Sequence, residues 1–229
     1  MRILLLGHGR MGRLVESLAP DYGGTIVAVI DEHAGADAIA AAGGADVAID
    51  FTLADAVPRN LPQLAARKLN VVIGTTGWQA QEQAMRAVAN AANIGVLAAS
   101  NFSLGMNIYQ LAVEEASRHF ANHPEFGAWI HEAHHVMKKD APSGTAITIR
   151  EGMERAGYSR PIDMSSTRAG HIPGTHTAGF DGPSETIAFT HTVRDRAVFA
   201  RGALVAAQWL VGKRGWFSIR DLLKAENRL

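Results

Sequence analysis

Cysteine is absent from this 229-residue chain, and so is an excess of charge of either sign. Without cysteine, disulfides, thiol catalysis and thiolate metal ligands are excluded. The 22 basic and 22 acidic side chains balance, so no global field recruits nucleic acid or an anionic membrane. No apolar run approaches the roughly 20 residues of a transmembrane helix. We therefore expect a soluble, cytoplasmic protein that binds neither nucleic acid nor membrane, and in which any anion site is local.

The beginning of the chain has the pattern of a dinucleotide-binding loop. An apolar strand predicted over Ile3–Leu6 leads into the glycine loop Gly7–Gly12, and helical spacing follows. In such a loop Gly7 makes the tight turn, Gly9 lets the backbone approach a pyrophosphate, and Gly12 allows close packing of the helix. The order of strand, glycine loop and helix makes the motif more specific than its letters alone.

An acidic residue follows the second predicted strand, Thr25–Ile30, at the position expected of a ribose ligand. The carboxylate of Asp31 suits the 2′ and 3′ hydroxyls of an adenosine ribose and repels a 2′-phosphate. Neither Glu32 nor His33 supplies the arginine or lysine that would offset this repulsion. The sequence thus predicts NADH as the preferred cofactor, with NADPH possible because Arg10 is a nearby cation. The alternative is that Asp31 is only a helix cap or a solvated turn residue.

Strands and helices then alternate as expected of a parallel sheet. Strands are predicted over 45–52, 70–73 and 94–98, and helices over 54–68 and 79–93. Because ligands bind beyond the carboxyl ends of such strands, three loops should line one crevice, namely Gly7–Gly12, Gly74–Gly77 and Ala99–Phe102. The predicted cofactor-binding residues are Gly7, His8, Gly9, Arg10, Met11, Gly12, Asp31, Gly74, Thr75, Thr76, Ala99, Ser100, Asn101 and Phe102.

After a predicted helix over 103–120 the rhythm changes to strands and turns. We expect strands over 126–131, 165–167, 171–180, 185–191 and 197–200, and helices over 201–211 and 218–223. The fold class is thus α/β, with a Rossmann-like parallel-sheet nucleotide domain (1–100 and 202–229) and a smaller α+β domain with a mixed sheet (101–201).

The segment Glu132–Ala146 concentrates the chemistry of the second domain. It holds two adjacent histidines, two lysines and a Ser-Gly-Thr turn, with Ser143 as the candidate N-cap of a helix that stops at Gly157. The first N–H groups of that helix, from Gly144 and Thr145, suit a carboxylate or phosphate. The alternative is that this segment has no binding role and is a solvated basic loop followed by an ordinarily capped helix.

No metal site is predicted in this segment. His131, His134 and His135 lie on or beside a strand, where neighbouring side chains point to opposite faces and do not converge easily. Two later histidines, His176 and His191, lie in strand-and-turn regions, where a lone histidine is more often structural, and they are not counted as site residues.

The run Glu-Ala-His-His-x-x-Lys-x-Asp-Ala-Pro-Ser-Gly-Thr-Ala resembles the signature of the 4-hydroxy-tetrahydrodipicolinate reductase (dihydrodipicolinate reductase) family of the lysine and diaminopimelate pathway. Similar motifs at 49–52, 74–77, 101–107 and 168–203 extend the resemblance over nearly the whole chain. It implies that NAD(P)H reduces a cyclic imine derived from 4-hydroxy-tetrahydrodipicolinate to tetrahydrodipicolinate. The small substrate is a dicarboxylate.

The resemblance also implies residue roles. His134 and Lys138 would be catalytic, and which of them gives the proton stays open; His135, Gly144 and Thr145 would bind substrate. The second domain would bind substrate and assemble a homotetramer through its sheet. The chain departs from the family in a shorter glycine loop and in Val136 and Met137, where many relatives carry basic or polar residues. A reductase of a related imine, or a dinucleotide-binding sensor without catalysis, are the alternatives.

Overall fold

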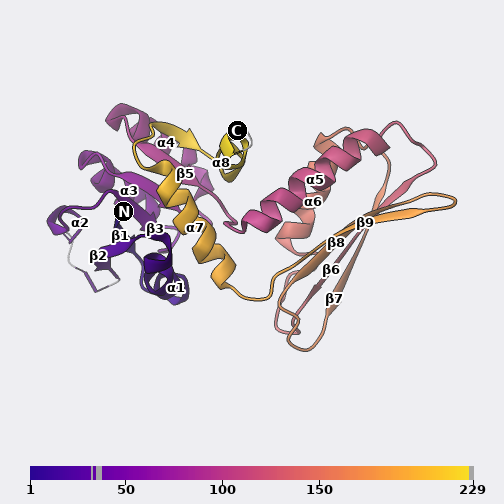
Figure 1. Ribbon diagram of the computed structural model, residues 1–229, viewed down its shortest axis with the longest axis horizontal. Helices are drawn as coiled ribbons and strands as arrows, with labels where there is room; N and C mark the ends of the chain where they lie inside the picture. Colours follow the sequence, from indigo (N-terminus) through magenta and orange to yellow (C-terminus); the bar gives the residue numbers. More distant parts are fainter. Residues whose placement is uncertain (32, 35–37, 227–229) are drawn as a thin grey trace. The chain divides into compact units, whose positions relative to one another are not determined.

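The computed structural model describes residues 1–31, 33–34 and 38–226, which form two compact units (Figure 1). Unit 1 contains Met1–Leu104 together with Ala197–Leu229, and unit 2 contains Gly105–Arg196. Each unit has its own hydrophobic core. Unit 1 is therefore made of two separate pieces of the chain, whereas unit 2 is continuous.

Unit 1 is built on a parallel sheet of six strands in the order β10-β5-β4-β3-β1-β2. The strands are β1 (Arg2–Leu6), β2 (Thr25–Ile30), β3 (Val47–Asp50), β4 (Asn70–Ile73), β5 (Gly95–Ala98) and β10 (Gly215–Phe217). The predicted Rossmann-like sheet is confirmed. Because all strands run the same way, the loops that follow them meet at one edge of the sheet.

Helices cover both faces of this sheet. On one face α1 and α7 pack together, and on the other α3 packs between α2 and α4. The inner strands are buried on both sides, which explains their nearly continuous apolar sequences. No described helix has both the length and the apolar character needed to cross a membrane. The helices are α1 (Arg10–Leu18), α2 (Ala38–Ala41), α3 (Val57–Ala66), α4 (Glu82–Ala92), α7 (Ala197–Leu210) and α8 (Ile219–Glu226), with 3-10 turns at Ala19–Tyr22 and Gln79–Gln81.

One predicted strand of the C-terminal part is wrong. Residues 197–200, expected as a strand, form the first turn of α7. A short apolar run cannot be assigned to helix or strand by its periodicity alone. Here the buried small residues that continue to Leu210 make it one long helix packed on the sheet.

After α7 the chain returns to the six-stranded sheet and adds β10, a strand that was not predicted. Its three residues pair with β5 in parallel. The buried side chain of Asn70 in β4 stabilises this return: its Nδ2 donates to the carbonyls of Leu210 (2.7 Å) and Lys213 (3.1 Å), and its Oδ1 accepts from the N–H of Gly95 (2.7 Å). One amide thus joins the starts of two neighbouring strands to the segment that leads into the third.

Unit 2 is a mixed four-stranded sheet in the order β7-β6-β8-β9, with α5 and α6 on one face (Figure 1). β6 and β7 are parallel and the other pairs are antiparallel, so the predicted mixed sheet is confirmed. Alternate residues of β6, namely Ala128, Ile130 and Glu132, are buried on the helix side. The elements are α5 (Leu104–Phe120), β6 (Gly127–His134), α6 (Gly144–Arg155), β7 (Ile162–Arg168), β8 (Thr175–Asp181) and β9 (Thr186–Thr192).

Candidate functional site

The glycine loop of unit 1 has the backbone geometry of a phosphate cradle. Gly7 has a φ of +87°, and a Cβ there would lie 2.4 Å from the carbonyl oxygen of Phe51. A Cβ on Gly12 would lie 2.0 Å from the carbonyl oxygen of Gly7, so α1 can pack this closely only with glycine. A Cβ on Gly9 would meet no atom within 4 Å. Gly9 caps α1 without a side-chain hydrogen bond, which leaves the helix N-terminus open to an anion.

The side chains of this loop differ in their surroundings. His8 Nε2 lies 2.7 Å from Glu16 Oε2, and Arg13 Nε donates to the His8 carbonyl at 3.3 Å, so α1 holds His8 in place. Arg10 is exposed and Met11 is half-buried. The imidazole of His8 is thus bound to the helix, whereas the guanidinium of Arg10 is open to solvent.

Asp31 lies at the carboxyl end of β2 and is exposed. Its Oδ1 accepts a hydrogen bond of 3.0 Å from the main-chain N–H of His33. This contact is that of a turn residue, and the residue is exposed. Glu32, which entered the cofactor argument, lies outside the described residues.

A buried carboxylate joins the loop after β3 to one of the predicted cofactor loops, the loop after β4. Asp50, at the end of β3, is 1% exposed and accepts from the Thr52 N–H (2.9 Å), the Thr52 hydroxyl (2.6 Å) and Asn60 Nδ2 (3.1 Å). It also accepts from the hydroxyl of Thr75 at 3.0 Å, in the loop after β4. The Thr75 hydroxyl is therefore bonded within the protein. Asp50 was missed as a site residue, although an acid that ends an apolar strand and precedes threonine was the available signal.

The loops after β4 and β5 are packed through aromatic rings. A Cβ on Gly74 would lie 2.1 Å from the ring of Phe51, and that ring meets Phe102 edge-on with centroids 6.2 Å apart. Asn101 Oδ1 accepts from the N–H of Ser103 at 2.9 Å, which fixes the turn before α5. Thr76 and Ser100 are exposed. These loops thus combine a packed base with exposed polar tips.

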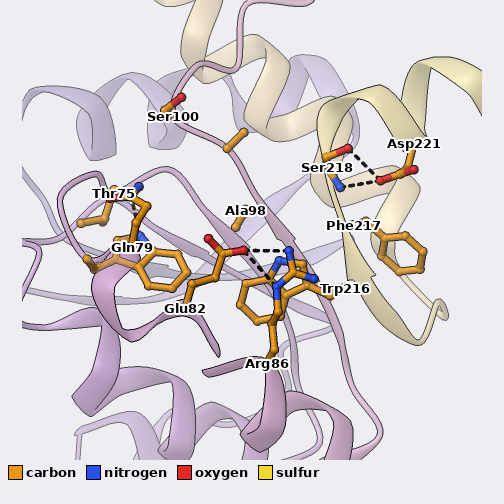
Figure 2. A pocket seen from close by; sticks show the side chains of 12 residues that line it. Thr75, Gln79, Glu82, Arg86, Ala98, Ser100, Trp216, Phe217, Ser218 and Asp221 are labelled. Carbon is orange, nitrogen blue, oxygen red and sulfur yellow. Dashed lines mark hydrogen bonds and ion pairs between the residues drawn. The ribbon is translucent and has the colours of Figure 1, made fainter. Parts of the chain in front are cut away.

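A cavity of about 470 Å³ opens at the carboxyl ends of β4, β5 and β10 (Figure 2). Three predicted cofactor residues, Thr75, Ala99 and Ser100, line it. Glu82 and Arg86 form an ion pair of 2.7 Å on its wall, and the guanidinium of Arg86 lies 4.8 Å from the ring centroid of Trp216. The sequence did not single out the C-terminal lining residues, Trp216, Phe217, Ser218 and Asp221. Unit 1 therefore offers a pocket at the ends of these three strands, in addition to the phosphate cradle after β1.

In unit 2 the centre of the candidate site is a buried carboxylate between an arginine and a histidine. Glu132 is fully buried, and its Oε1 and Oε2 accept from Arg168 Nη2 (2.6 Å) and Nη1 (3.0 Å). Oε2 also bonds to Nδ1 of His134, and Oε1 accepts from the Ser143 N–H at 3.3 Å. The predicted catalytic His134 is therefore bound to a charged group that the sequence analysis left without a role.

A second histidine, His176, lies next to His134. It is 4% exposed, and the two rings meet edge-on with centroids 5.1 Å apart. Its Nε2 lies 3.1 Å from the hydroxyl of Ser143, which also accepts from the N–H of Ala146 as the N-cap of α6. The predicted cap is thus confirmed, and it has a second partner. His176 Nδ1 has no hydrogen-bond partner among the described residues.

The surroundings of these groups set their protonation. Burial acts to raise the pKa of Glu132, but hydrogen bonds from Arg168, Ser166 and His134 outweigh it and lower that pKa to about 2. Burial lowers the pKa of His134, opposed by its bond to Glu132. Burial, with His134 nearby, lowers the pKa of His176 to about 4. Near neutral pH the group is therefore one carboxylate, one guanidinium and two neutral imidazoles.

Glu132, His134 and His176 also place three possible ligand atoms within 4.8 Å of one another. Both oxygens of Glu132 already accept from Arg168, whose positive charge opposes a metal cation at the same place. The donor set therefore fits proton chemistry better than metal binding.

The other predicted residues of unit 2 lie in the loop after β6 and at the start of α6. Lys138 Nζ donates to both carboxylate oxygens of Asp140, at 2.7 and 2.9 Å. This bond is the main cause that lowers the pKa of Asp140, and the N–H of Gly144 contributes in the same direction. His135 and Thr145 are half-exposed and Gly144 is exposed. Lys138 and the N–H of Gly144, two of the groups predicted at the substrate site, thus act on the carboxylate of Asp140.

Comparisons with known proteins agree over both units. Residues 1–102 match the family described as dihydrodipicolinate reductase, N-terminus, and residues 105–223 match dihydrodipicolinate reductase, C-terminus. The 4-hydroxy-tetrahydrodipicolinate reductase of Stenotrophomonas maltophilia is 38% identical, and that of Methanoregula boonei 35%; each alignment covers 98% of both chains. A dipicolinate-bound dihydrodipicolinate reductase from Paenisporosarcina sp. TG-14 has a similar fold, with a TM-score of 0.82, 20% identity, and coverage of 95% of this chain and 97% of that one.

The sequence resemblance is therefore confirmed by matches that cover both units, and the fold agrees with it. A glycine cradle in one unit and a histidine bound to a buried carboxylate in the other are consistent with an oxidoreductase. The chain belongs to the dihydrodipicolinate reductase family.

Proposed function

We propose that this protein catalyses the NAD(P)H-dependent reduction of 4-hydroxy-tetrahydrodipicolinate to tetrahydrodipicolinate, a step of lysine and diaminopimelate biosynthesis. The family membership supports the reaction. The observation that carries it is the bond between His134 and buried Glu132 beside the N-terminus of α6, because reduction of an imine dicarboxylate needs a proton donor next to an anion site. A sensor without catalysis would need neither group.

The cofactor part of the proposal concerns unit 1. The pyrophosphate binds at the glycine loop and the start of α1, where Gly9 leaves the backbone open. NADH is preferred over NADPH because exposed Asp31 repels a 2′-phosphate. When bound, the nicotinamide cofactor supplies a hydride. Thr75, Ala99 and Ser100 contribute the lining of its pocket.

The substrate part of the proposal concerns unit 2. One carboxylate of the dicarboxylate binds at the start of α6, through Gly144 and Thr145, with His135 and Lys138 as further contacts. Negative charge develops on the substrate as it is reduced, and a nearby acid must neutralise it. His134 and Lys138 are the two candidates for this role. Lys138 is paired with Asp140, whereas His134 has one ring nitrogen beyond its bond to Glu132.

Two further parts of the proposal concern the setting of the protein. A biosynthetic reductase that uses a nicotinamide cofactor is expected in the cytoplasm, where that cofactor pool lies. A homotetramer would form through the face of the unit 2 sheet opposite α5 and α6, where Trp129 and the hydrogen-bonded pair Thr177 and Thr190 lie. Analytical ultracentrifugation of the wild-type protein tests this assembly.

The test of the activity is the loss of nicotinamide absorbance with freshly generated 4-hydroxy-tetrahydrodipicolinate, with NADH and NADPH compared. Wild-type protein should oxidise NADH faster than NADPH, and His134→Gln should lower kcat by roughly 10²- to 10⁴-fold. Asp31→Asn should narrow the difference between the cofactors. Binding of NADH without oxidation by the wild type would contradict the proposed reaction and favour a sensor or another imine substrate.

A further inference from the structure

The bond to Glu132 determines which ring nitrogen of His134 carries the proton. A carboxylate only accepts hydrogen bonds, and the low pKa of Glu132 keeps it ionised. Nδ1 of His134 bonds to Oε2 of Glu132, so Nδ1 must carry the proton. In the neutral ring, Nε2 then holds a lone pair.

Nε2 of His134 lies on the side of the imidazole ring that faces Gly174. A Cβ at Gly174 would come within 3.3 Å of Nε2, and Gly174 has a φ of +135°, which side chains rarely adopt. Glycine there keeps the approach to Nε2 free of a side chain. The ring nitrogen available to a substrate is therefore Nε2.

Arg168 holds the carboxylate in this orientation. Its two terminal nitrogens bond one to each oxygen of Glu132, which fixes the plane of the carboxylate. Strand pairing brings these four residues together. His134 on β6 is opposite Arg168 on β7, and Glu132 on β6 is opposite His176 on β8. A buried charge held this way costs stability, and a fixed imidazole is a functional reason to keep it.

We propose that Glu132 is a positioning residue that fixes His134 as the Nδ1-protonated tautomer, so that Nε2 is the atom that exchanges a proton with the substrate. This inference rests on the proposed function. Nε2 takes a proton from solvent to give the imidazolium, whose charge Glu132 offsets. As the substrate is reduced, Nε2 gives that proton to it, and His134 returns to the same neutral tautomer.

The first test uses the wild-type protein and needs no turnover. Nitrogen-15 NMR of histidine-labelled protein distinguishes protonated from unprotonated ring nitrogens, and the His134 signals are those absent from His134→Gln. The inference requires a proton on Nδ1 and none on Nε2 near pH 7.5. A proton on Nε2, or rapid exchange between the two tautomers, overturns it.

The second test is Glu132→Gln. Its amide oxygen is expected at the position of Oε1, which faces the donors Arg168 Nη2 and Ser143 N–H, so its NH₂ faces Nδ1 and forces the other tautomer. We expect kcat to fall roughly 10²- to 10⁴-fold with little change in the KM for substrate. Glu132→Asp keeps an acceptor-only group and should retain more activity than Glu132→Gln. Glu154→Gln, whose surface carboxylate pairs with Arg150 at 3.6 Å, is the matched control.

The pH dependence separates a positioning role from a purely structural one. The charged or titratable groups around His134 are Glu132, Lys138, Arg168 and His176. The kcat profile should fall on its alkaline side as the His134 imidazolium loses the proton that it gives to the substrate. Loss of the Glu132 charge should move this alkaline limb to lower pH, because the imidazolium loses its stabilising partner. An unmoved profile in a folded Glu132→Gln variant overturns the inference. A wild-type protein without turnover contradicts the proposed function instead, and the tautomer is then still decided by NMR.

Discussion

At the scale of single residues, unit 2 places its own carboxylate where the substrate carboxylate is proposed to bind. Asp140 binds Lys138 through both oxygens, and the N–H of Gly144 also acts on it. The Asp140 side chain is exposed, so its ion pair with Lys138 contributes little to stability. Substrate must compete with Asp140 for the same positive groups, which weakens binding.

Asp140→Asn is therefore expected to lower the KM for the dicarboxylate by about two- to fivefold, as the loss of an exposed ion pair allows. Steady-state kinetics at constant NADH measure this change, and kcat should stay nearly the same. Asp163→Asn, an exposed aspartate on β7, is the control of equal charge change. A higher KM for Asp140→Asn would mean that Asp140 supports the site instead of competing in it.

At the scale of elements, the start of α6 is coupled to the sheet beneath it. Ser143 accepts from the N–H of Ala146 and bonds to the buried ring of His176. The helix that offers its N-terminus to an anion is thus joined through one hydroxyl to β8. Loss of that hydroxyl affects both the helix cap and a buried imidazole.

We expect Ser143→Ala to lower the free energy of unfolding of unit 2 by about 2 kcal/mol, since it removes a cap and leaves buried polar groups without partners. Fluorine-19 NMR of protein labelled with 5-fluorotryptophan can follow guanidinium unfolding of unit 2 separately, because Trp129 is its one tryptophan. Thr148→Ala, on the exposed side of the same helix, should change it by less than about 0.5 kcal/mol. Equal effects of the two variants would contradict the coupling.

The elements that could be predicted from sequence are those with a long local pattern. Strands β2 and β4 match their predicted bounds because apolar runs end there in polar or glycine residues. β10 has only three residues, and residues 197–200 are too short to distinguish from a strand, so tertiary packing decided both.

The candidate site shows the same limit. His134 and the cap Ser143 stand in a recognisable run of residues. The partners of His134 do not, because Arg168 and His176 reach it only through strand pairing across the sheet. Glu132 was visible in the signature, but its burial on the helix side depends on how β6 packs.

At the scale of the whole molecule, the buried groups of unit 2 make stability depend on pH. In the unfolded chain His176 titrates near its ordinary value of 6.5, whereas burial lowers its pKa to about 4 in the folded protein. Between these values the unfolded state binds more protons, so stability falls as the pH falls from 6.5 to about 4. Glu132, with a pKa of about 2 in place of 4.5, adds a further loss below pH 4.5.

The free energy of unfolding of unit 2 should thus decrease by about 3 kcal/mol between pH 7 and pH 4 through His176 alone. The Trp129 fluorine signal in guanidinium titrations at several pH values measures it. His176→Gln should make the curve less steep above pH 4.5, with the remaining slope due to His134 and His191, whose pKa values burial also lowers. His119→Gln, an exposed histidine on α5, should leave the curve unchanged. A pH-independent stability of unit 2 in the wild type would show that His176 is not buried in its neutral form.

The hydrogen bonds of the Asn70 side chain also show in which order the two units can be completed during translation. Its amide bonds to the carbonyl of Leu210, which lies 140 positions later in the chain. A ribosome reaches Leu210 roughly 7 to 30 s after Asn70. In that interval all of unit 2 is synthesised, and β5 keeps an open edge until β10 emerges. During translation the nucleotide-binding unit is therefore the last to be completed, and the unpaired edge of β5 can pair with a neighbouring chain until β10 has been synthesised.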